Sequence, residues 1–144
     1  MLRFWSRWLA AAGGAMAALG AAMAALYGGR AFDQARDGVN AAFWPGGATA
    51  PELARYQHWV HAVLGGTLLG WGVMFAWVAA VPFRRGEPGA WWSIAVATTA
   101  WYVVDTAASL HFGVIFNAAL NTVLYAAFVV PIAGSARLFF TRAT

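Results

Sequence analysis

Residues Trp101–Tyr125 read WYVVDTAASLHFGVIFNAALNTVLY and hold nearly all the polar side chains of an otherwise apolar C-terminal half. Two pairs of these side chains are each four residues apart: Asp105 with Ser109, and Asn117 with Asn121. Residues four apart share one face of a helix. Gly113 is the only plausible reversal in this stretch. The sequence therefore predicts two helices joined near Gly113, with their polar faces brought together.

The composition predicts a membrane protein. Of the 144 residues, 62% are hydrophobic and only 10% are charged, whereas a soluble domain has roughly 25% charged residues. The length fits a single domain. The chain has no cysteine, which excludes disulfides, thiolate metal sites and cysteine nucleophiles. The basic residues are all arginines at segment ends, so nucleic acid is not an expected partner.

The apolar segments predict an all-α fold, a bundle of four transmembrane helices. We expect these helices at about residues 8–27, 50–81, 89–111 and 115–140. Pro131 lies within the fourth helix and should kink it or leave the carbonyl of Ala127 unpaired. The second helix contains a G-x-x-x-G spacing at Gly66 and Gly70, which is a weak packing signal.

The first helix is rich in small residues at four-residue spacing, which lets helices approach closely in lipid. The repeats are Ala10, Gly14 and Ala18, and Gly13, Ala17 and Ala21. We therefore expect this helix to be the packed one of the bundle, or the contact surface of an oligomer.

Residues 28–49 form the one long connection. Three of its apolar side chains share one helical face: Phe32, Val39 and Phe43. This pattern fits either a short amphipathic helix on the bilayer surface, over about 31–44, or an ordered loop with aromatic anchors. Thr49 is placed to cap the second helix, with Glu52 three residues later as in a capping box.

The arginines predict the orientation of the helices. Alternating connections place six arginines on one side: Arg3, Arg7, Arg84, Arg85, Arg137 and Arg142. The other side has only Arg30, Arg36 and Arg55, which nearby acidic residues balance. Positive residues favour the cytoplasmic side, so we expect both termini in the cytoplasm and the chain in the inner membrane of a bacterium.

This topology brings polar groups from three helices to similar depth near the outer surface. They are His58, His61, Asp105, Ser109, His111, Asn117, Asn121 and Tyr125. A carboxylate inside a membrane helix is costly and usually finds a partner. Asp105 is therefore the expected centre of the cluster, with His61 as its first partner and His111 as its second.

Two interpretations of the cluster remain open. Asp105, Ser109, Asn117 and Asn121 can form a hydrogen-bond network that only fixes the bundle. Alternatively, the cluster forms a pocket for a lipid, a quinone or a small polar solute, with Tyr125 helping to orient the ligand.

Cofactors are a further alternative, although we expect none. Haem could be held by His61 and His111 on facing helices. A divalent metal could be held by His58, His61 and Asp105, with His111 as a further ligand, since imidazole and carboxylate ligands suit zinc or iron. Neither set forms an established motif.

With its helices placed, the chain resembles the small four-helix bacterial membrane proteins grouped with DoxX-like families. The resemblance lies in GGTLLGWG at Gly65–Gly72, PFRR at Pro82–Arg85 and DTAASLHFG at Asp105–Gly113. It implies a fold more than an activity and transfers no catalytic residue. The long first connection departs from the family pattern.

We therefore expect a non-enzymatic membrane protein. Its outer polar cluster is predicted to bind a partner membrane protein, a lipid or a small ligand, and a homo-oligomer is also compatible with its small-faced first helix. The sequence contains neither a serine–histidine elbow nor an HExxH motif. The alternative is a redox or metal protein that uses His61.

Overall fold

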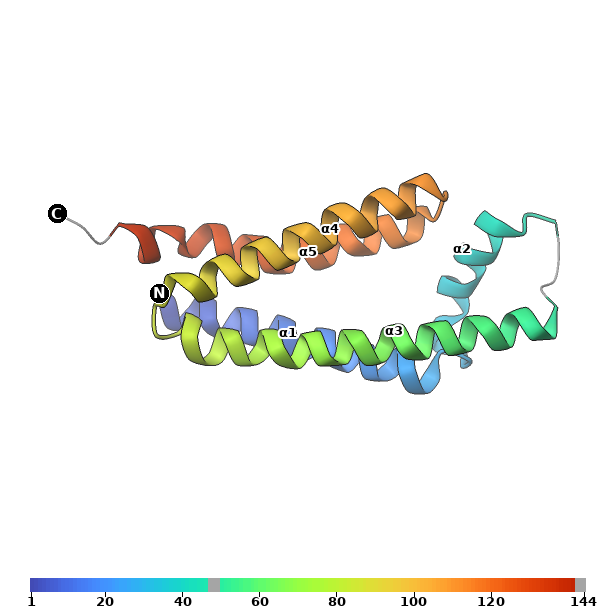
Figure 1. Ribbon diagram of the computed structural model, residues 1–144, viewed down its shortest axis with the longest axis horizontal. Helices are drawn as coiled ribbons and strands as arrows, with labels where there is room; N and C mark the ends of the chain where they lie inside the picture. Colours follow the sequence, from blue (N-terminus) through green and yellow to red (C-terminus); the bar gives the residue numbers. More distant parts are fainter. Residues whose placement is uncertain (47–49, 142–144) are drawn as a thin grey trace.

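A computed structural model describes residues 1–46 and 50–141, which form a long bundle of helices (Figure 1). The helices in chain order are α1 (Leu2–Leu26), η1 (Arg30–Phe32), α2 (Asp33–Phe43), α3 (Pro51–Val78), η2 (Ala79–Phe83), α4 (Pro88–His111) and α5 (Ile115–Phe140). The described residues contain no strand. The predicted all-α fold is confirmed.

Three helical segments have the length and hydropathy needed to cross a membrane: Leu2–Leu26, Pro51–Phe83 and Ile115–Phe140. The 24 residues of α4 could span about 36 Å. It is not among the three candidates because Asp105, His111 and its aromatic and hydroxyl side chains lower its mean hydropathy. The described chain is thus helical, with three helices compatible with a membrane.

The first helix is longer than predicted. α1 begins at Leu2 and not near residue 8, because Arg3 and Arg7 are good helix formers and extend the helix beyond the apolar run. At its other end, α1 stops at Leu26. The helix predicted over 115–140 has these bounds in the structure, as α5.

The second long helix differs from its predicted range at both ends. Ala50 occupies the N-cap of α3, whereas the predicted cap, Thr49, lies outside the described residues. The α-helical part of α3 ends at Val78, and the five residues of η2 follow as a π-helical turn. Pro82 lies in this turn and has no N–H to donate to a regular helix.

α1 and α3 form an antiparallel pair whose backbones nearly touch. The glycines in the contact are seven residues apart on each helix: Gly13 and Gly20 on α1, and Gly65 and Gly72 on α3. A Cβ atom on Gly65 would lie 2.6 Å from the backbone nitrogen of Ala24. The close approach of α1 to another helix is confirmed, but α1 is not the packed helix of the bundle, because it buries no larger share of its span than Pro51–Phe83 does.

Three other glycines that the sequence suggested as packing positions do not lie in this contact. Gly66 and Gly70 have open space where a Cβ atom would be, and so does Gly14 on α1. Seven residues make almost two full turns of a helix, so a seven-residue spacing keeps the small residues on one seam between two antiparallel helices.

α4 and α5 form the predicted hairpin, and its turn lies at Gly113. Gly113 has a φ of +74°, a conformation that glycine adopts without steric cost. The N–H of Val114 donates to the carbonyl of Ser109 at 2.8 Å, and the N–H of Gly113 donates to that of Leu110 at 3.2 Å. These two bonds are the Schellman motif that ends many helices.

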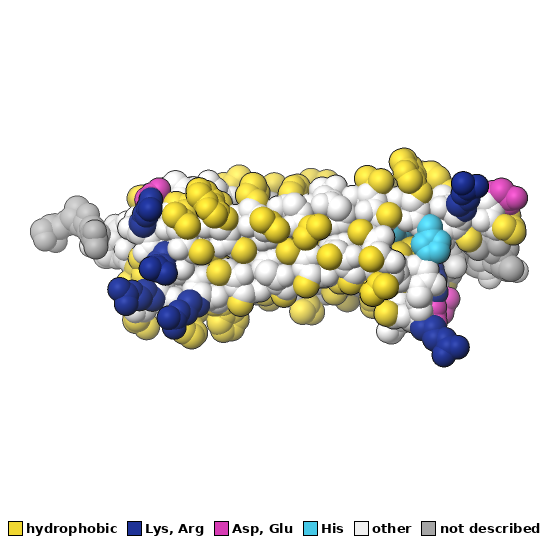
Figure 2. Space-filling model, turned by 90° about the horizontal axis from the view of Figure 1, so that it is seen from below, with side chains coloured by type: hydrophobic (Ala, Val, Ile, Leu, Met, Phe, Trp, Pro, Cys, Tyr) yellow, Lys and Arg dark blue, Asp and Glu magenta, His cyan; other side chains and the backbone are white. Residues whose placement is uncertain are grey.

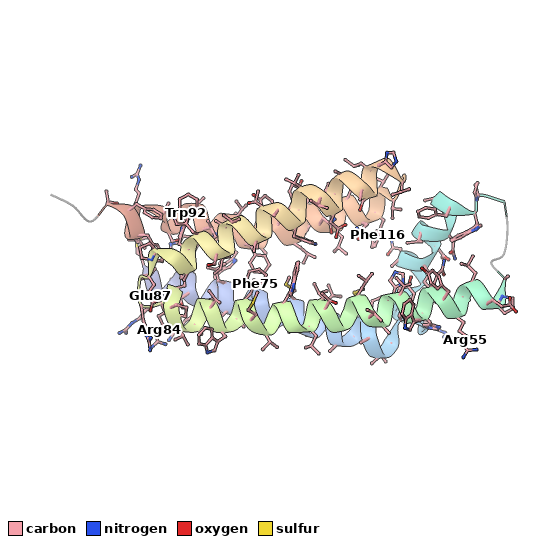
Figure 3. All side chains as sticks on the ribbon, in the orientation of Figure 1. Arg55, Phe75, Arg84, Glu87, Trp92 and Phe116 are labelled. Atoms are coloured by element: carbon pink, nitrogen blue, oxygen red, sulfur yellow. The ribbon has the colours of Figure 1, made fainter. Side chains whose placement is uncertain are left out.

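We call the α1–α3 pair and the α4–α5 pair the two hairpins. They pack together at the end of the bundle where α1 begins and α5 ends. Most of the buried apolar side chains lie there: Leu9, Met16, Phe75, Ala79, Phe83, Ala90, Ile94, Phe128, Ile132 and Phe139. The rings of Phe75 and Phe128 are 5.4 Å apart, and Figure 3 shows Phe75 between the hairpins. This contact joins α3 to α5.

Pro131 creates a further link between the hairpins. Because proline has no N–H, the carbonyl of Ala127 loses its partner within α5. The indole N–H of Trp8 on α1 donates to this carbonyl at 2.9 Å. The predicted free carbonyl is confirmed, and a side chain from another helix satisfies it.

At the other end the hairpins diverge, and α2 lies across the opening (Figure 1). Gln57 of α3 donates a hydrogen bond to Asn40 of α2 at 3.0 Å. The rings of Phe43 and Phe112 are 5.8 Å apart, which joins α2 to the end of α4. Arg36 adds hydrogen bonds from α2 to the backbone that follows α1.

The segment 31–44 is thus mostly helical, as one of the two sequence interpretations predicted. Residues 31–43 lie within η1 and α2, and Trp44 is the C-cap of α2. The ordered-loop interpretation does not hold for this segment.

Charge divides the two ends of the bundle. Figure 2 shows basic side chains at both ends, with the larger group at one end, and Figure 3 shows Arg84 at that end and Arg55 at the opposite end. We call the first the basic end, defined by Arg3, Arg7, Arg84, Arg85 and Arg137, and the other the α2 end. The chain begins at the basic end, and α5 finishes there (Figure 1).

Candidate functional site

A cavity of about 660 Å³ lies between the two hairpins at the α2 end. All four long helices contribute to its walls, and α2 covers its outer side. Most of the lining is apolar, including Leu68, Trp71, Leu120 and Leu124. Figure 3 shows Phe116, another lining residue, close to α2. Volume and lining are those of a small-molecule site.

The polar part of this lining centres on Asp105. Its Oδ1 atom accepts hydrogen bonds from Asn117 Nδ2 at 2.8 Å and from Asn121 Nδ2 at 3.0 Å. Ser109 Oγ lies 3.2 Å from the same oxygen. The structure therefore brings together the four side chains that the two four-residue spacings predicted.

Trp101 completes the surroundings of Asp105 and was missed by the sequence reasoning. Its indole N–H donates to Asp105 Oδ2 at 3.1 Å. The signal was present in the sequence, because Trp101 precedes Asp105 by four residues and so shares its helix face. Both carboxylate oxygens thus have protein donors.

Within the described residues, this network joins α4 to α5 and makes no hydrogen bond to α1 or α3. It supports the interpretation that the polar residues fix the fold, since the carboxylate needs no ligand to satisfy it. The amide oxygens of Asn117 and Asn121 accept no hydrogen bond from the described residues. They leave acceptor capacity in the cavity wall.

His61 lies on the opposite wall of the cavity and does not form the expected pair with Asp105 among the described contacts. Its Nδ1 atom is 2.8 Å from the carbonyl oxygen of Gln57, one turn earlier in α3. Its ring stacks on that of Tyr27, with the centroids 3.7 Å apart. The hairpins diverge at this end, and this divergence separates His61 from Asp105.

Tyr27, the stacking partner, is a second residue that sequence reasoning did not assign to the site. Its side chain is only 3% exposed, and its hydroxyl has no hydrogen-bond partner among the described residues. Burial raises the pKa of this hydroxyl above its usual value, an effect that the nearby Arg36 guanidinium opposes. The hydroxyl is therefore neutral at physiological pH.

The structure does not bring Tyr125 into the predicted cluster. Its hydroxyl lies 3.1 Å from Thr99 Oγ1, and its ring stacks on Tyr102 at 4.3 Å, away from the cavity. The reason is helical geometry: at about 100° per residue, position 125 is rotated by about 80° from Asn117. Leu124, seven residues after Asn117, returns to the same face and lines the cavity.

The remaining two histidines lie away from the cavity lining. His58 is exposed and packs edge-on against Tyr27 at 5.9 Å. His111 is exposed in the last turn of α4 beside Phe112. Within residues 1–46 and 50–141, no three histidine or acidic side chains are close enough to hold a metal ion. The predicted metal set is not brought together.

Comparison with known proteins gives no family: no protein-family model, curated protein or solved structure matches this chain. The resemblance to DoxX-like proteins stays a prediction. The function is therefore inferred from the site alone.

Proposed function

We propose that this chain is a four-span membrane protein that binds a small amphipathic molecule from the bilayer in the cavity between its hairpins. The observation that carries the proposal is the cavity itself. It measures about 660 Å³, its walls are mostly apolar, and its polar groups lie mainly in one strip on α4 and α5. Small-molecule sites combine these features.

The polar strip defines the head group of the ligand. Asn117 Nδ2 donates to Asp105 and Ser109, and Asn121 Nδ2 donates to Asp105, so both amide oxygens remain as acceptors. Because His61 is hydrogen-bonded through Nδ1, its Nε2 atom is also an acceptor in the neutral ring. A head group that donates, such as a hydroxyl or an amine, fits this wall, and the Asp105 carboxylate disfavours an anion. A lipid or a quinol has this chemistry.

Packing supports the fourth membrane crossing. α4 lies beside α5, and its outward side chains Val103 and Val104 are 57% and 70% exposed. Large apolar side chains of this exposure suit contact with lipid and not with water. The four long helices alternate in direction, so both termini share the basic end, which the positive-inside rule assigns to the cytoplasm of a bacterial cell.

Native mass spectrometry of gently extracted protein tests the proposal. Ala108 lines the cavity and Ala107, its neighbour on α4, does not. Both are exposed, so Ala107→Phe is a matched control for Ala108→Phe. We expect a bound mass of lipid or quinol size in the wild type and in Ala107→Phe, and its loss in Ala108→Phe.

Equal retention in both variants, or no bound organic molecule in the wild type, would contradict the proposal. Metal analysis of the same preparation addresses the alternative function. Iron or zinc near one atom per chain, lost in His61→Ala, would instead support a haem or metal protein. The proposed ligand class predicts no such loss.

A further inference from the structure

A second cavity, of about 230 Å³, lies at the basic end between α1 and the end of α3. Three arginines and three small residues line it: Arg3, Ser6, Arg7, Ala10, Ala80 and Arg84. It is remote from the cavity at the α2 end, and no lining residue is shared by the two.

Two helix faces build this cavity. Arg3 and Arg7 are four residues apart on α1, so both project from one side of the helix. Ala80 and Arg84 are also four residues apart, and the π-helical turn η2 lies between α3 and Arg84. Because the side chain of Ala80 is small, space remains between the arginines of the two helix faces.

A buried hydrogen bond fixes the two faces relative to each other. Ser6 is 2% exposed, and its hydroxyl donates to the carbonyl of Ala79 in η2 at 2.7 Å. The bond lies directly beneath the cavity, because Ser6 itself belongs to the lining. The backbone segments that carry the arginines are therefore fixed relative to each other, although the arginine side chains are exposed.

The charge of the cavity is not compensated by any lining carboxylate. Glu87, labelled near Arg84 in Figure 3, lies 3.9 Å from Arg85, which is outside the lining. The other ion pair within the described residues joins Arg36 to Asp33 on the η1–α2 segment. Three arginines thus line one small space, and among the described residues none of them forms an ion pair with an acidic side chain.

We propose that this cavity binds a phosphate group, held by Arg3, Arg7 and Arg84. Guanidinium groups bind phosphate oxygens in pairs of parallel hydrogen bonds. Basic pockets between membrane helices on the cytoplasmic side hold anionic lipid head groups. The volume of about 230 Å³ is sufficient for a phosphate group, and acyl chains can extend along the apolar surface outside. A soluble phosphate compound would present the same group.

Arginines that only determine the membrane topology are not expected to line a common cavity. Arg85 is therefore the control for a positive charge at this end outside the cavity. It lies at the same end and has the same charge, but it is outside the lining. We therefore compare Arg84→Gln and Arg7→Gln with Arg85→Gln. All three variants lose one positive charge, so diffuse attraction to anions falls equally in each.

The full-length protein in detergent is titrated with phosphatidylglycerol, and bound lipid is counted by native mass spectrometry. We expect binding to fall about fivefold more in Arg84→Gln and in Arg7→Gln than in Arg85→Gln, which loses only the diffuse attraction. Inorganic phosphate is added as a competitor. Displacement of the lipid identifies a site open to soluble phosphates, and absence of displacement identifies a lipid site.

Equal losses in Arg84→Gln and Arg85→Gln would overturn the proposal, as would wild-type binding in all variants. Circular dichroism verifies that each variant folds. Should Arg84→Gln fail to fold, Arg7→Gln gives the same comparison on the other helix. The test does not depend on the larger cavity, because the two cavities share no lining residue.

Discussion

Asp105 is held by four donors from its own hairpin, and this arrangement predicts its contribution to stability. In Asp105→Asn, one acceptor oxygen becomes an NH₂ group that faces other donors. Because Asp105 is half-buried, we expect a loss of about 1 kcal/mol in the free energy of unfolding, the lower end of the cost of an unsatisfied buried polar group. Thermal unfolding in detergent measures it, with exposed Asp37→Asn as the control.

An unchanged melting temperature in Asp105→Asn would contradict a structural role for the network. Ligand retention in the same variant separates the two interpretations further. A less stable protein that keeps its bound molecule has a structural Asp105, whereas loss of the molecule at full stability shows that Asp105 acts on the ligand.

Gly113 makes a second prediction at the scale of one residue. Its φ of +74° is unfavourable for any residue with a Cβ atom, so Gly113→Ala should destabilise the hairpin by about 1–2 kcal/mol. Gly14→Ala is the control, because Gly14 is exposed inside α1 with open space around it. Chemical unfolding should show a loss for Gly113→Ala and none for Gly14→Ala; equal stability of the two variants would exclude a conformational role for Gly113.

Local spacing predicted the side chains that meet within one hairpin and failed for those that must meet across two. Four-residue spacing sufficed for Asp105 with Ser109 and for Asn117 with Asn121. The position of His61 depends instead on how far the hairpins diverge, which is set by α2 and by packing at the basic end. No local pattern in the sequence predicts the distance between the two hairpins at the α2 end.

At the scale of the element, the α1–α3 contact depends on which glycines face the seam. A Cβ atom on Gly65 would meet backbone atoms of α1 at 2.6 Å, whereas one on Gly66 would meet open space. We expect Gly65→Ala to lower the melting temperature clearly and Gly66→Ala to leave it unchanged or raise it. A difference of the opposite sign would show that the helices are not packed in this register.

The sequence predicted that α1 packs closely but not the register, because Gly65, Gly66, Gly70 and Gly72 are equally small. The rotation of a helix about its axis is decided by the partner it meets, and here a seven-residue repeat on both helices sets it. The helical structure of the segment 31–44 was easier to predict, since its apolar face and its polar faces are both visible in the sequence.

At the scale of the whole molecule, the chain offers a direct test of orientation because it contains no cysteine. Ala41 is exposed on α2, and Gly89 is exposed near the start of α4. With Ala41→Cys and Gly89→Cys introduced singly, a membrane-impermeant maleimide should label only Ala41→Cys in intact cells. Both should react after the membrane is opened. Labelling of Gly89→Cys in intact cells would reverse the proposed topology.

The central claim is that the space between the hairpins holds a membrane-soluble molecule. A crystal structure of the full chain grown in a lipidic mesophase tests it most directly. We expect continuous non-protein density in the cavity, with its polar end within hydrogen-bonding distance of the Asn117 or Asn121 amide oxygen. A cavity that is closed by contact between the hairpins, or that holds only water, would contradict the account.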